Sequence, residues 1–543
     1  MVDPRRHRVT VLAGGVGAAH GPSTGLPYAA GWAALCRLVT NAHLSGERGN
    51  PLSTPDRVAA AARGLARPGA HPGDSEPANL VVLLGPESDV GRAVLRTDRA
   101  GARALLQAWQ VLLPRDALVL EIVCHGGPDG TSGSRNHAAR MLALADALGV
   151  PAILSAAVRH IDPLDARIVD VLDAARRLVL LDRRHLDRVS AAGHLASTST
   201  MHRIAREVAE RAGADPARAE RLIADTLPLA RRCAQHPRRD LGIGAVHLPE
   251  PHILGIPEGT DPQRVLDERC HAAIPTRYAG AGERERRAVE ARLREELDVV
   301  AALGYPTYFM TVATVVDLIR EMGVRVAARG SGAGSLVNYL LGISGVDPIR
   351  YDLLMERFCS PLRAELPDID IDVESARRTD IYQRILDRFG GERVTCVSMM
   401  DTYKVRHAIR DVGSVLGMPP GEVDEIAKAF PHIRARDARQ AIADLPELRQ
   451  RGLDGPQLST FFELVEALDG LPRHIALHPC GVILSNASLL DRTPVEASWL
   501  GFPMSQFDKD DVETLGLLKL DVLGIRMQSS MAYAVSEIER TTG

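Results

Sequence analysis

Three aspartates alternate with apolar residues in the segment LPDIDIDVES. Asp368, Asp370 and Asp372 are separated by Ile369 and Ile371, which is the two-residue period of a β-strand. On such a strand the three carboxylates share one face and repel one another unless a cation lies between them. Carboxylates spaced about 7 Å apart along a strand suit a site for a pair of divalent metal ions. The alternative interpretation is an acidic edge strand that discourages aggregation.

A second acidic segment, LGLLKLDVLGI, lies far downstream. Lys519 and Asp521 share one face of the strand that this segment predicts, and Leu518, Leu520 and Val522 take the other. An aspartate in an apolar strand is costly to bury unless it is paired or bound to metal, although it could also cap a turn or meet an arginine. Two acidic strands from distant parts of the chain match the needs of metal-dependent phosphoryl transfer.

A glycine-rich turn precedes the first acidic segment. GVRVAARGSGAGSLVNYLLGI predicts a strand, a turn from Arg329 to Ser335, and a helix that opens at Ser335. Backbone N–H groups at a helix N-terminus form an anion site, and glycines allow a phosphate to approach closely. The turn lacks the G-K-[ST] ending of a Walker loop and is not G-x-G-x-x-G, so it is equally typical of a tight strand-to-helix connection.

The composition limits the class of protein. The chain has 543 residues, of which 45% are hydrophobic and 25% charged, which excludes a disordered chain and predicts several domains. The net charge of −4 requires any phosphate-binding surface to be local. No apolar run approaches the roughly 20 residues of a membrane span, and the N-terminus does not resemble a signal peptide, so we expect a cytoplasmic protein. The seven cysteines form no C-x-x-C pair, which disfavours structural zinc.

The elements that position these residues follow two patterns. In the first third of the chain, apolar runs (VTVLAG, NLVVLLG, ALVLEIV and PAILSAAV) alternate with helical patterns, which predicts a largely parallel sheet with sites at the carboxyl ends of its strands. A Pro-rich stretch, His247 to Pro262, is typical of a linker. After it, a charged helix is expected from Glu283 to Gly304, with Leu293, Leu297 and Val300 on its apolar face.

Six motifs carry a specific resemblance. They are RGSGAGSL (329–336), DPIRYDLLMERF, LPDIDID, HAIRDVGSVLG (407–417), HPCGVILS (478–485) and QFDKDDVETLGLLKLDVLGI (506–525). In order and spacing, from about residue 243 to the end, the chain resembles the bacterial C-family DNA polymerases, the family of the DNA polymerase III alpha subunit. The resemblance implies template-directed DNA synthesis, in which a dNTP is added to a primer 3′ end with release of pyrophosphate.

The implied fold is a multidomain α/β protein. A partial PHP-like α/β domain over 1–242 precedes a nucleotidyltransferase-type α+β palm over 243–400 and 476–527. A helical thumb over 401–475 interrupts the palm, and the fingers begin at 528–543. Because the resemblance starts inside the PHP domain and stops inside the fingers, we expect a chain truncated at both ends that does not sustain synthesis alone.

The resemblance also assigns site residues. Asp370, Asp372 and Asp521 correspond to the catalytic aspartates that hold two Mg²⁺ ions, with Asp368 beside them but not a ligand. The residues expected to bind the nucleotide are Arg329, Gly330, Ser331, Arg363 and Lys519. The residues expected to face DNA phosphates are Lys404, Arg406 and Arg410, the last two at i and i+4 on one helix, although solvated helix charges give the same spacing.

The PHP-like domain lacks most of the metal ligands of its family. In this chain the family's Asn, Asp and His positions hold Ala156, Ala157 and Arg159. The position of a further His holds Val169. His160 is displaced by one residue, which turns it to the other face of a strand. Glu121 and His125 could still bind metal, but the losses favour a scaffold over a proofreading or pyrophosphate-cleaving centre.

The partners implied are primer–template DNA and dNTP, with the family's sliding clamp and proofreading exonuclease and no membrane. Two other functions remain open at this point: a non-catalytic fragment of such a polymerase, and a metal-dependent phosphoesterase in the N-terminal domain. The palm motifs do not distinguish a replicative enzyme from an error-prone relative.

Overall fold

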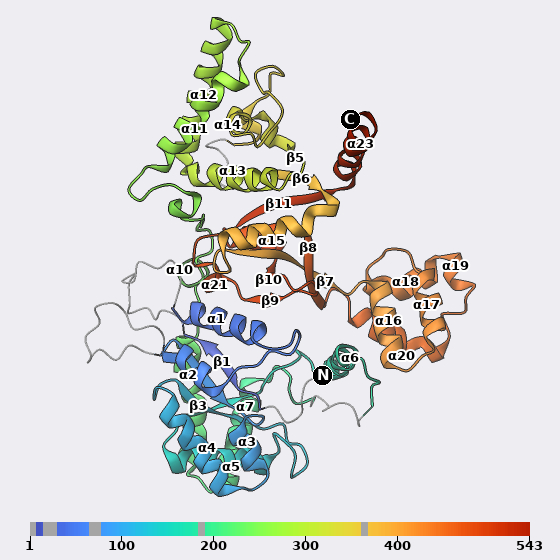
Figure 1. Cartoon of the computed structure of the whole chain (residues 1–543). Coiled ribbons are helices and arrows are strands. Elements are labelled where there is room, and N and C mark those ends of the chain that lie inside the picture. Colours follow the sequence, from blue (N-terminus) through green and yellow to red (C-terminus); the bar gives the residue numbers. More distant parts are fainter. Residues whose placement is uncertain (1–6, 15–29, 64–77, 183–190, 360–366) are drawn as a thin grey trace. The chain divides into compact units, whose positions relative to one another are not determined.

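The computed structural model describes residues 7–14, 30–63, 78–182, 191–359 and 367–543. The chain divides into two compact units, which are described separately (Figure 1). The first unit comprises Met1–Leu38, Leu52–His236 and Met400–Ile475, and the second comprises Val39–Pro51, Pro237–Met399 and Ala476–Gly543. The structure is thus a mixed α/β protein with two sheets.

A four-stranded sheet forms the centre of the first unit. Its order is β1 (Thr10–Ala13), β2 (Leu80–Leu84), β3 (Leu118–Val123) and β4 (Ala152–Ser155). Strands β2, β3 and β4 run parallel, whereas β1 pairs antiparallel with β2. All four lie within the predicted apolar runs, and β2 and β3 are buried along almost their whole length, as strands covered on both faces of a sheet are.

Most helices of this part of the chain pack against the apolar core of the sheet, whereas the helix Ala166–Arg177 packs with the inserted helices described below. The bounds of the helices in this part are α1 (Ala30–Leu44), α2 (Pro55–Arg63), α3 (Asp89–Leu95), α4 (Arg99–Leu112), α5 (Arg135–Leu148), α6 (Ala166–Arg177), α7 (Thr198–Arg211), α8 (Pro216–Ala224) and α9 (Thr226–Arg232). Helix α1 continues into the residues of the second unit. Several begin at a serine or aspartate whose side chain accepts a backbone N–H, as Ser134 does at α5.

An inserted group of helices follows strand β7 and has a core of its own. It consists of α16 (Val405–Val415), α17 (Pro420–Ala429), α18 (Ala438–Asp444), α19 (Pro446–Arg449) and α20 (Ser459–Ala467). Phe430 and Phe462 are buried in its centre, and Val171 and Ala174 of α6 pack into the same core. This packing joins the insertion to the first unit. The expected boundaries of palm, thumb and fingers remain predictions.

The second unit is built on a seven-stranded mixed sheet. Its strands are β5 (Val326–Arg329), β6 (Asp370–Glu374), β7 (Val394–Thr402), β8 (Pro472–Leu484), β9 (Val495–Ala497), β10 (Pro503–Asp508) and β11 (Leu518–Ile525). Their order is β5-β6-β11-β8-β7-β10-β9. Strand β6 pairs antiparallel with β5 and parallel with β11, and β11 pairs antiparallel with β8. The two predicted acidic strands are therefore neighbours, although the insertion separates them in sequence.

The helices of the second unit include the predicted charged helix. Their bounds are α10 (Pro237–Asp240), α11 (Pro262–Arg277), α12 (Glu283–Leu303), α13 (Pro306–Glu321), α14 (Leu336–Leu340), α15 (Arg378–Phe389), α21 (Leu489–Arg492), α22 (Lys509–Thr514) and α23 (Arg526–Thr542). Helix α12 buries Leu293, Leu297 and Val300, as its apolar spacing predicts. It ends at Gly304, whose φ of 71° places it in the left-handed region that favours glycine.

The Pro-rich stretch His247–Pro262 is packed rather than loose. Glu250 accepts hydrogen bonds from Arg393 and from the backbone N–H of Ala487, and Ile253 accepts one from Arg388. The stretch is therefore part of the second unit and does not act as a free linker.

Within the described ranges, no single helix is both long and apolar enough to cross a membrane. Helices α12 and α13 are long and apolar enough only when they are taken together, and the chain bends by 111° between them.

Candidate active site

Asp370 and Asp521 face each other across the boundary between β6 and β11. The parallel register pairs Asp370 with Asp521, and Leu523 with Asp372. Because Ile371 and Val373 are buried on the opposite face of β6, its carboxylates point away from the core. The expected alternation of the first acidic strand is thus present, and the pairing brings the second acidic strand to it.

Three carboxylates converge at this point. Asp368, Asp370 and Asp521 each offer one oxygen, and these oxygens all lie within 4.8 Å of one another. Asp521 is only 8% exposed, and its buried Oδ1 has no hydrogen-bond partner. Clustered carboxylate oxygens are the ligands that hard divalent cations such as Mg²⁺ prefer, and an orphaned buried oxygen is costly without a ligand. The residues present therefore fit a divalent metal site.

Two cations border these carboxylates. Arg329 pairs with Asp370 in the antiparallel register of β5 and β6, and its Nη2 lies 3.8 Å from Asp370 Oδ2. Its Nε lies 3.3 Å from Asp372 Oδ1. On the other side, Lys519 Nζ lies 3.2 Å from Asp521 Oδ2. The sequence predicted that Lys519 and Asp521 share a face, and the structure confirms this.

Burial and mutual repulsion shift the proton affinities of the site. Burial raises the pKa of Asp368, Asp370 and Asp372, and the nearby Asp521 carboxylate raises the first two further. Burial lowers the pKa of Lys519, but attraction to Asp521 and Asp368 outweighs it, so that this pKa is raised. The site thus holds an excess of negative charge that a metal ion would relieve.

Asp368 and Asp372 occupy different surroundings from those expected. We predicted Asp372 as a metal ligand and Asp368 as a bystander, whereas the converging oxygens belong to Asp368, Asp370 and Asp521. Asp372 lies one strand repeat further along β6, opposite Leu523 and beside Arg329. The assignment of Asp372 remains a prediction, and the geometry adds Asp368 to the candidates.

The glycine-rich turn and the helix after it lie where the sequence predicts them, with Ser335 as the N-cap of the helix. Residues Gly330–Gly334 form a 3₁₀ turn, and the first residue of helix α14 after its N-cap is Leu336. Gly330 has a φ of +79°, and a Cβ on Gly334 would lie 2.6 Å from the carbonyl oxygen of Leu354, so neither position accommodates a side chain easily. Arg329, Gly330 and Ser331 are exposed and can reach a ligand.

The anion site expected at the start of this helix is already filled. The hydroxyl of Ser335 and the backbone N–H of Val337 both donate to Oε2 of Glu296, a buried residue of α12. These two donors are therefore not open to a phosphate, and we correct the prediction: the exposed part of the turn, not the start of α14, is the candidate phosphate site. Sequence analysis missed Glu296, although its i+3 and i+7 spacing from Leu293 and Val289 places it on the apolar stripe of α12.

Gly481 allows the closest approach of a third strand to the site. It pairs with Asp521 in the antiparallel register of β8 and β11, and a Cβ there would lie 2.0 Å from the Leu520 carbonyl oxygen. Beside it, the thiol of Cys480 is hydrogen-bonded to Nδ1 of His478, and burial raises the pKa of that thiol to about 12. The HPCGVILS motif thus supplies the strand that supports Asp521.

The remaining predicted residues are not part of this cluster. Arg363 falls outside the described residues. Lys404 is exposed immediately before α16. On α16, Arg406 donates to the carbonyl oxygen of Phe430 and Arg410 pairs with Asp424 at 2.9 Å, so both guanidinium groups have partners inside the inserted helices.

Comparison with known proteins covers nearly the whole chain. Residues 264–524 match the family model described as the bacterial DNA polymerase III alpha NTPase domain. The chain is 33% identical to an error-prone DNA polymerase of Symbiobacterium thermophilum over 94% of its own length and 45% of the relative. It belongs to the bacterial C-family DNA polymerases. It is also 35% identical to the DNA polymerase III subunit alpha of Bacillus subtilis over 56% of its length and 27% of the relative, and 31% identical to that of Escherichia coli K12 over 85% and 38%.

This C-family chain spans less than half the length of these curated relatives. Both error-prone polymerases and DNA polymerase III alpha subunits are among them. The family is therefore established, and the choice between the two kinds of enzyme stays open, as the sequence motifs left it.

In the described residues before Gly242, no group of three potential metal ligands lies together. His125 follows β3, and its Nε2 contacts the carbonyl oxygen of Ala156 at 2.8 Å. Among the residues whose positions are described, the converging group of Asp368, Asp370 and Asp521 is the only set of three potential ligand residues within 4.8 Å. The carboxyl ends of β3 and β4 border a cavity of about 140 Å³ lined by Cys124, His125, Arg135, His194 and Glu207, among others. These residues do not form a metal centre as they stand.

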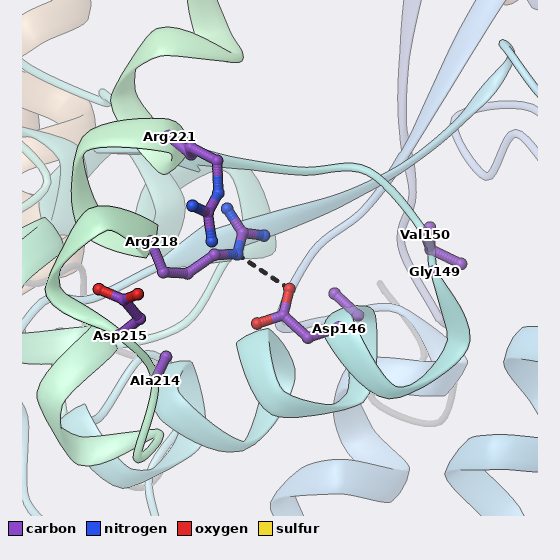
Figure 2. A pocket seen from close by; sticks show the side chains of 8 residues that line it. Asp146, Gly149, Val150, Ala214, Asp215, Arg218 and Arg221 are labelled. Atoms are coloured by element: carbon purple, nitrogen blue, oxygen red, sulfur yellow. Dashed lines mark hydrogen bonds and ion pairs between the residues drawn. The ribbon is translucent and has the colours of Figure 1, made fainter.

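A larger hollow lies elsewhere in the first unit (Figure 2). Its volume is about 430 Å³, and its charged lining residues are Asp146, Asp215, Arg218 and Arg221. Arg218 is nearly buried and its Nε donates to Asp146 at 2.9 Å. The positive and negative side chains balance there, so the hollow lacks the excess charge that would mark a site for an ionic ligand.

Proposed function

We propose that the second unit carries the nucleotidyl-transfer site of a template-directed DNA polymerase, which adds dNTP to a primer 3′ end and releases pyrophosphate. The observation that carries the proposal is the convergence of Asp368, Asp370 and Asp521 beside the exposed Arg329–Ser331 turn. Membership of the C-family supports it. Among the described residues, no comparable cluster favours an N-terminal phosphoesterase, and the convergence of carboxylates speaks against a non-catalytic fragment.

The acidic residues would hold the cofactor. Asp370 and Asp521 form the centre of the proposed ligand set, with Asp372 as the third catalytic aspartate and Asp368 within reach of the other two. Two Mg²⁺ ions held there would offset the charge of the triphosphate and activate the primer hydroxyl.

The basic residues and the turn would hold the nucleotide. Arg329 and Lys519, which neutralise the carboxylates, also provide the positive charge that a triphosphate requires. We propose that both side chains transfer from carboxylate to phosphate oxygens when the nucleotide binds. The backbone of Gly330 and the hydroxyl of Ser331 would complete the phosphate contacts, and Arg363 would add a further cation.

The rest of the chain would hold the DNA and the scaffold. In this proposal the second unit contains the palm, α16 to α20 form the thumb, α23 opens the fingers, and the PHP-like region serves as a scaffold. Primer–template DNA would contact Lys404, with Arg406 and Arg410 as further candidates. The sliding clamp and the proofreading exonuclease are the partners we propose for the whole protein, in the cytoplasm.

Magnesium-dependent binding of dNTP, measured by calorimetry, tests the proposal. The chain is compared with three variants, Asp370→Asn, Asp372→Asn and Asp521→Asn, and with Asp298→Asn, an exposed aspartate of α12, as the matched control. We expect binding that requires Mg²⁺, survives in the control and is lost in the three variants. Tight binding that is indifferent to all three would refute the assignment, and absence of binding in every form would leave the non-catalytic fragment.

A further inference from the structure

Glu296 is a buried carboxylate with three donors around it. It lies on α12 and is 1% exposed. Its Oε2 accepts hydrogen bonds from Ser335 Oγ at 3.0 Å and from the Val337 N–H at 3.1 Å. Its Oε1 accepts one from Arg292 Nε at 2.8 Å. Burial of a carboxylate is tolerated only with such partners, so the arrangement fixes Glu296 in one position.

The donors on Glu296 belong to the segment that shapes the glycine-rich turn. Ser335 caps α14, because its Oγ also accepts the N–H of Asn338 at 3.2 Å. The side-chain amide of Asn338 donates in turn to the carbonyl oxygen of Gly332 at 2.9 Å. The contacts of Glu296 thus extend, through two hydrogen-bonded residues, into the middle of the turn.

The turn leads directly to the metal-binding carboxylates. Arg329 is paired with Asp370 across β5 and β6, and a Cβ on Gly330 would lie 3.8 Å from Asp370 Oδ2. A shift of the turn by about 1 Å would therefore displace the groups that are to hold a triphosphate beside the metal ions, and misplacement of that size can cost up to 100-fold in rate.

We propose that Glu296 is a positioning residue for the nucleotide. It fixes the turn through Ser335 and Val337, and it occupies the donors at the start of α14 so that the triphosphate is directed to Arg329, Gly330 and Ser331. Glu296 does not touch the nucleotide itself. This inference rests on the proposed function, because it concerns the same dNTP site.

The test compares Mg²⁺–dNTP binding in the full chain and in variants of Glu296. In Glu296→Gln an amide replaces the carboxylate with the same shape, and loss of one charge-assisted hydrogen bond predicts about tenfold weaker binding. Glu295→Gln changes an exposed neighbour on the same helix and should bind as the unchanged chain does.

A second variant separates positioning from packing. Glu296→Ala leaves space for a small carboxylate, so added formate should restore most of the lost nucleotide affinity in this variant and have no effect on the unchanged chain. Hydrogen exchange at the Val337 amide should rise in the variant and fall again with formate. Should this variant fail to fold, Glu296→Asp, in which the carboxylate is withdrawn by one methylene, is expected to give an intermediate loss.

The outcomes are distinguishable. Wild-type affinity in Glu296→Gln, or a loss in Glu296→Ala that formate does not reverse, overturns the inference and leaves the proposed function intact. Absence of Mg²⁺-dependent dNTP binding in the unchanged chain overturns both.

Discussion

Arg329 pairs with Asp372 at 3.3 Å and reaches Asp370 at 3.8 Å, so a single guanidinium group spans two carboxylates of the same strand. Its positive charge lies where a metal ion would also be attracted. The arginine and the metal therefore compete for these carboxylates until a triphosphate offers the arginine another partner.

Replacement of Arg329 should affect metal and nucleotide in opposite directions. In Arg329→Gln we expect Mn²⁺ to bind the nucleotide-free protein about fivefold more tightly, the equivalent of about 1 kcal/mol for a half-exposed ion pair. The affinity for Mg²⁺–dNTP should fall in the same variant. Mn²⁺ binding followed by electron paramagnetic resonance, with the exposed Arg325→Gln as control, checks this. Weaker Mn²⁺ binding in Arg329→Gln would contradict the competition.

The contributions of Asp368 and Asp372 to metal binding can be compared by substituting each residue in turn. Because Asp368 converges with Asp370 and Asp521 while Asp372 is occupied by Arg329, Asp368→Asn should reduce Mn²⁺ affinity in nucleotide-free protein about tenfold, and Asp372→Asn should reduce it by less than threefold. With dNTP present, Asp372→Asn should also cause a large loss, since Arg329 then leaves that carboxylate. Equal losses for both variants without nucleotide would show that Arg329 does not shield Asp372.

The raised pKa of Asp370 predicts that replacing this carboxylate makes the protein more stable and yet insensitive to Mg²⁺. Its pKa is raised above 3.8 by burial, with Asp521 adding to the shift. A carboxyl group with a raised pKa in the folded state favours folding below pH 3.8, and this contribution is lost as the pH rises through the raised value. At neutral pH in EDTA, Asp370→Asn should therefore raise the melting temperature, by about 2 to 4 °C for about 1 kcal/mol. Added Mg²⁺ should stabilise the unchanged chain and not the variant.

Acidification should also release the metal. Protons and metal ions compete for Asp368, Asp370 and Asp372, whose pKa values are all raised by burial. Mn²⁺ affinity should therefore begin to fall at a higher pH than an ordinary aspartate, with a pKa near 3.9, would allow. A titration of Mn²⁺ binding between pH 7 and pH 4 measures this, and a constant affinity down to pH 4.5 would be evidence against it.

Lys404 and Arg406 should differ in their effect on DNA binding. Lys404 is exposed at the N-cap of α16, where a positive charge is unfavourable to the helix dipole and suggests a role other than stability. Lys404→Gln should weaken binding to primer–template DNA. In a plot of log affinity against log salt concentration, the magnitude of the slope should fall by about one. Arg406→Gln removes two hydrogen bonds to Phe430 and should lower thermal stability with a smaller effect on that slope. Fluorescence anisotropy at several salt concentrations distinguishes the two.

The local structure of the site could be predicted from the sequence because it depends on short-range periodicity. The alternation around Asp370 predicts a strand with Ile371 and Val373 buried, and both are fully buried. The same reasoning places Lys519 beside Asp521. These features depend on neighbours one to three residues away, so the pattern of residue types was sufficient.

The pairing between distant segments could not be predicted in the same way. Nothing in the periodicity of either strand specifies the register that sets Asp370 against Asp521 and Asp372 against Leu523. The place of Asp368 in the cluster follows from that register, since this residue lies before the start of β6. Glu296 was overlooked because a charged residue in a charged helix is normally exposed, and two of its three donors, Ser335 and Val337, come from a segment about forty positions later.

The register of β6 and β11 also decides when the site can form. Strand β6 pairs with β11. Along the chain, these two strands are separated by β7, the inserted helices, β8, β9 and β10. Non-local parallel pairing of this kind is slow, because a long loop must close before the contacts form. A growing chain on the ribosome therefore cannot bind metal through Asp370 and Asp521 until β11 has emerged, and acquisition of tight Mn²⁺ binding would report the last stage of folding of the second unit.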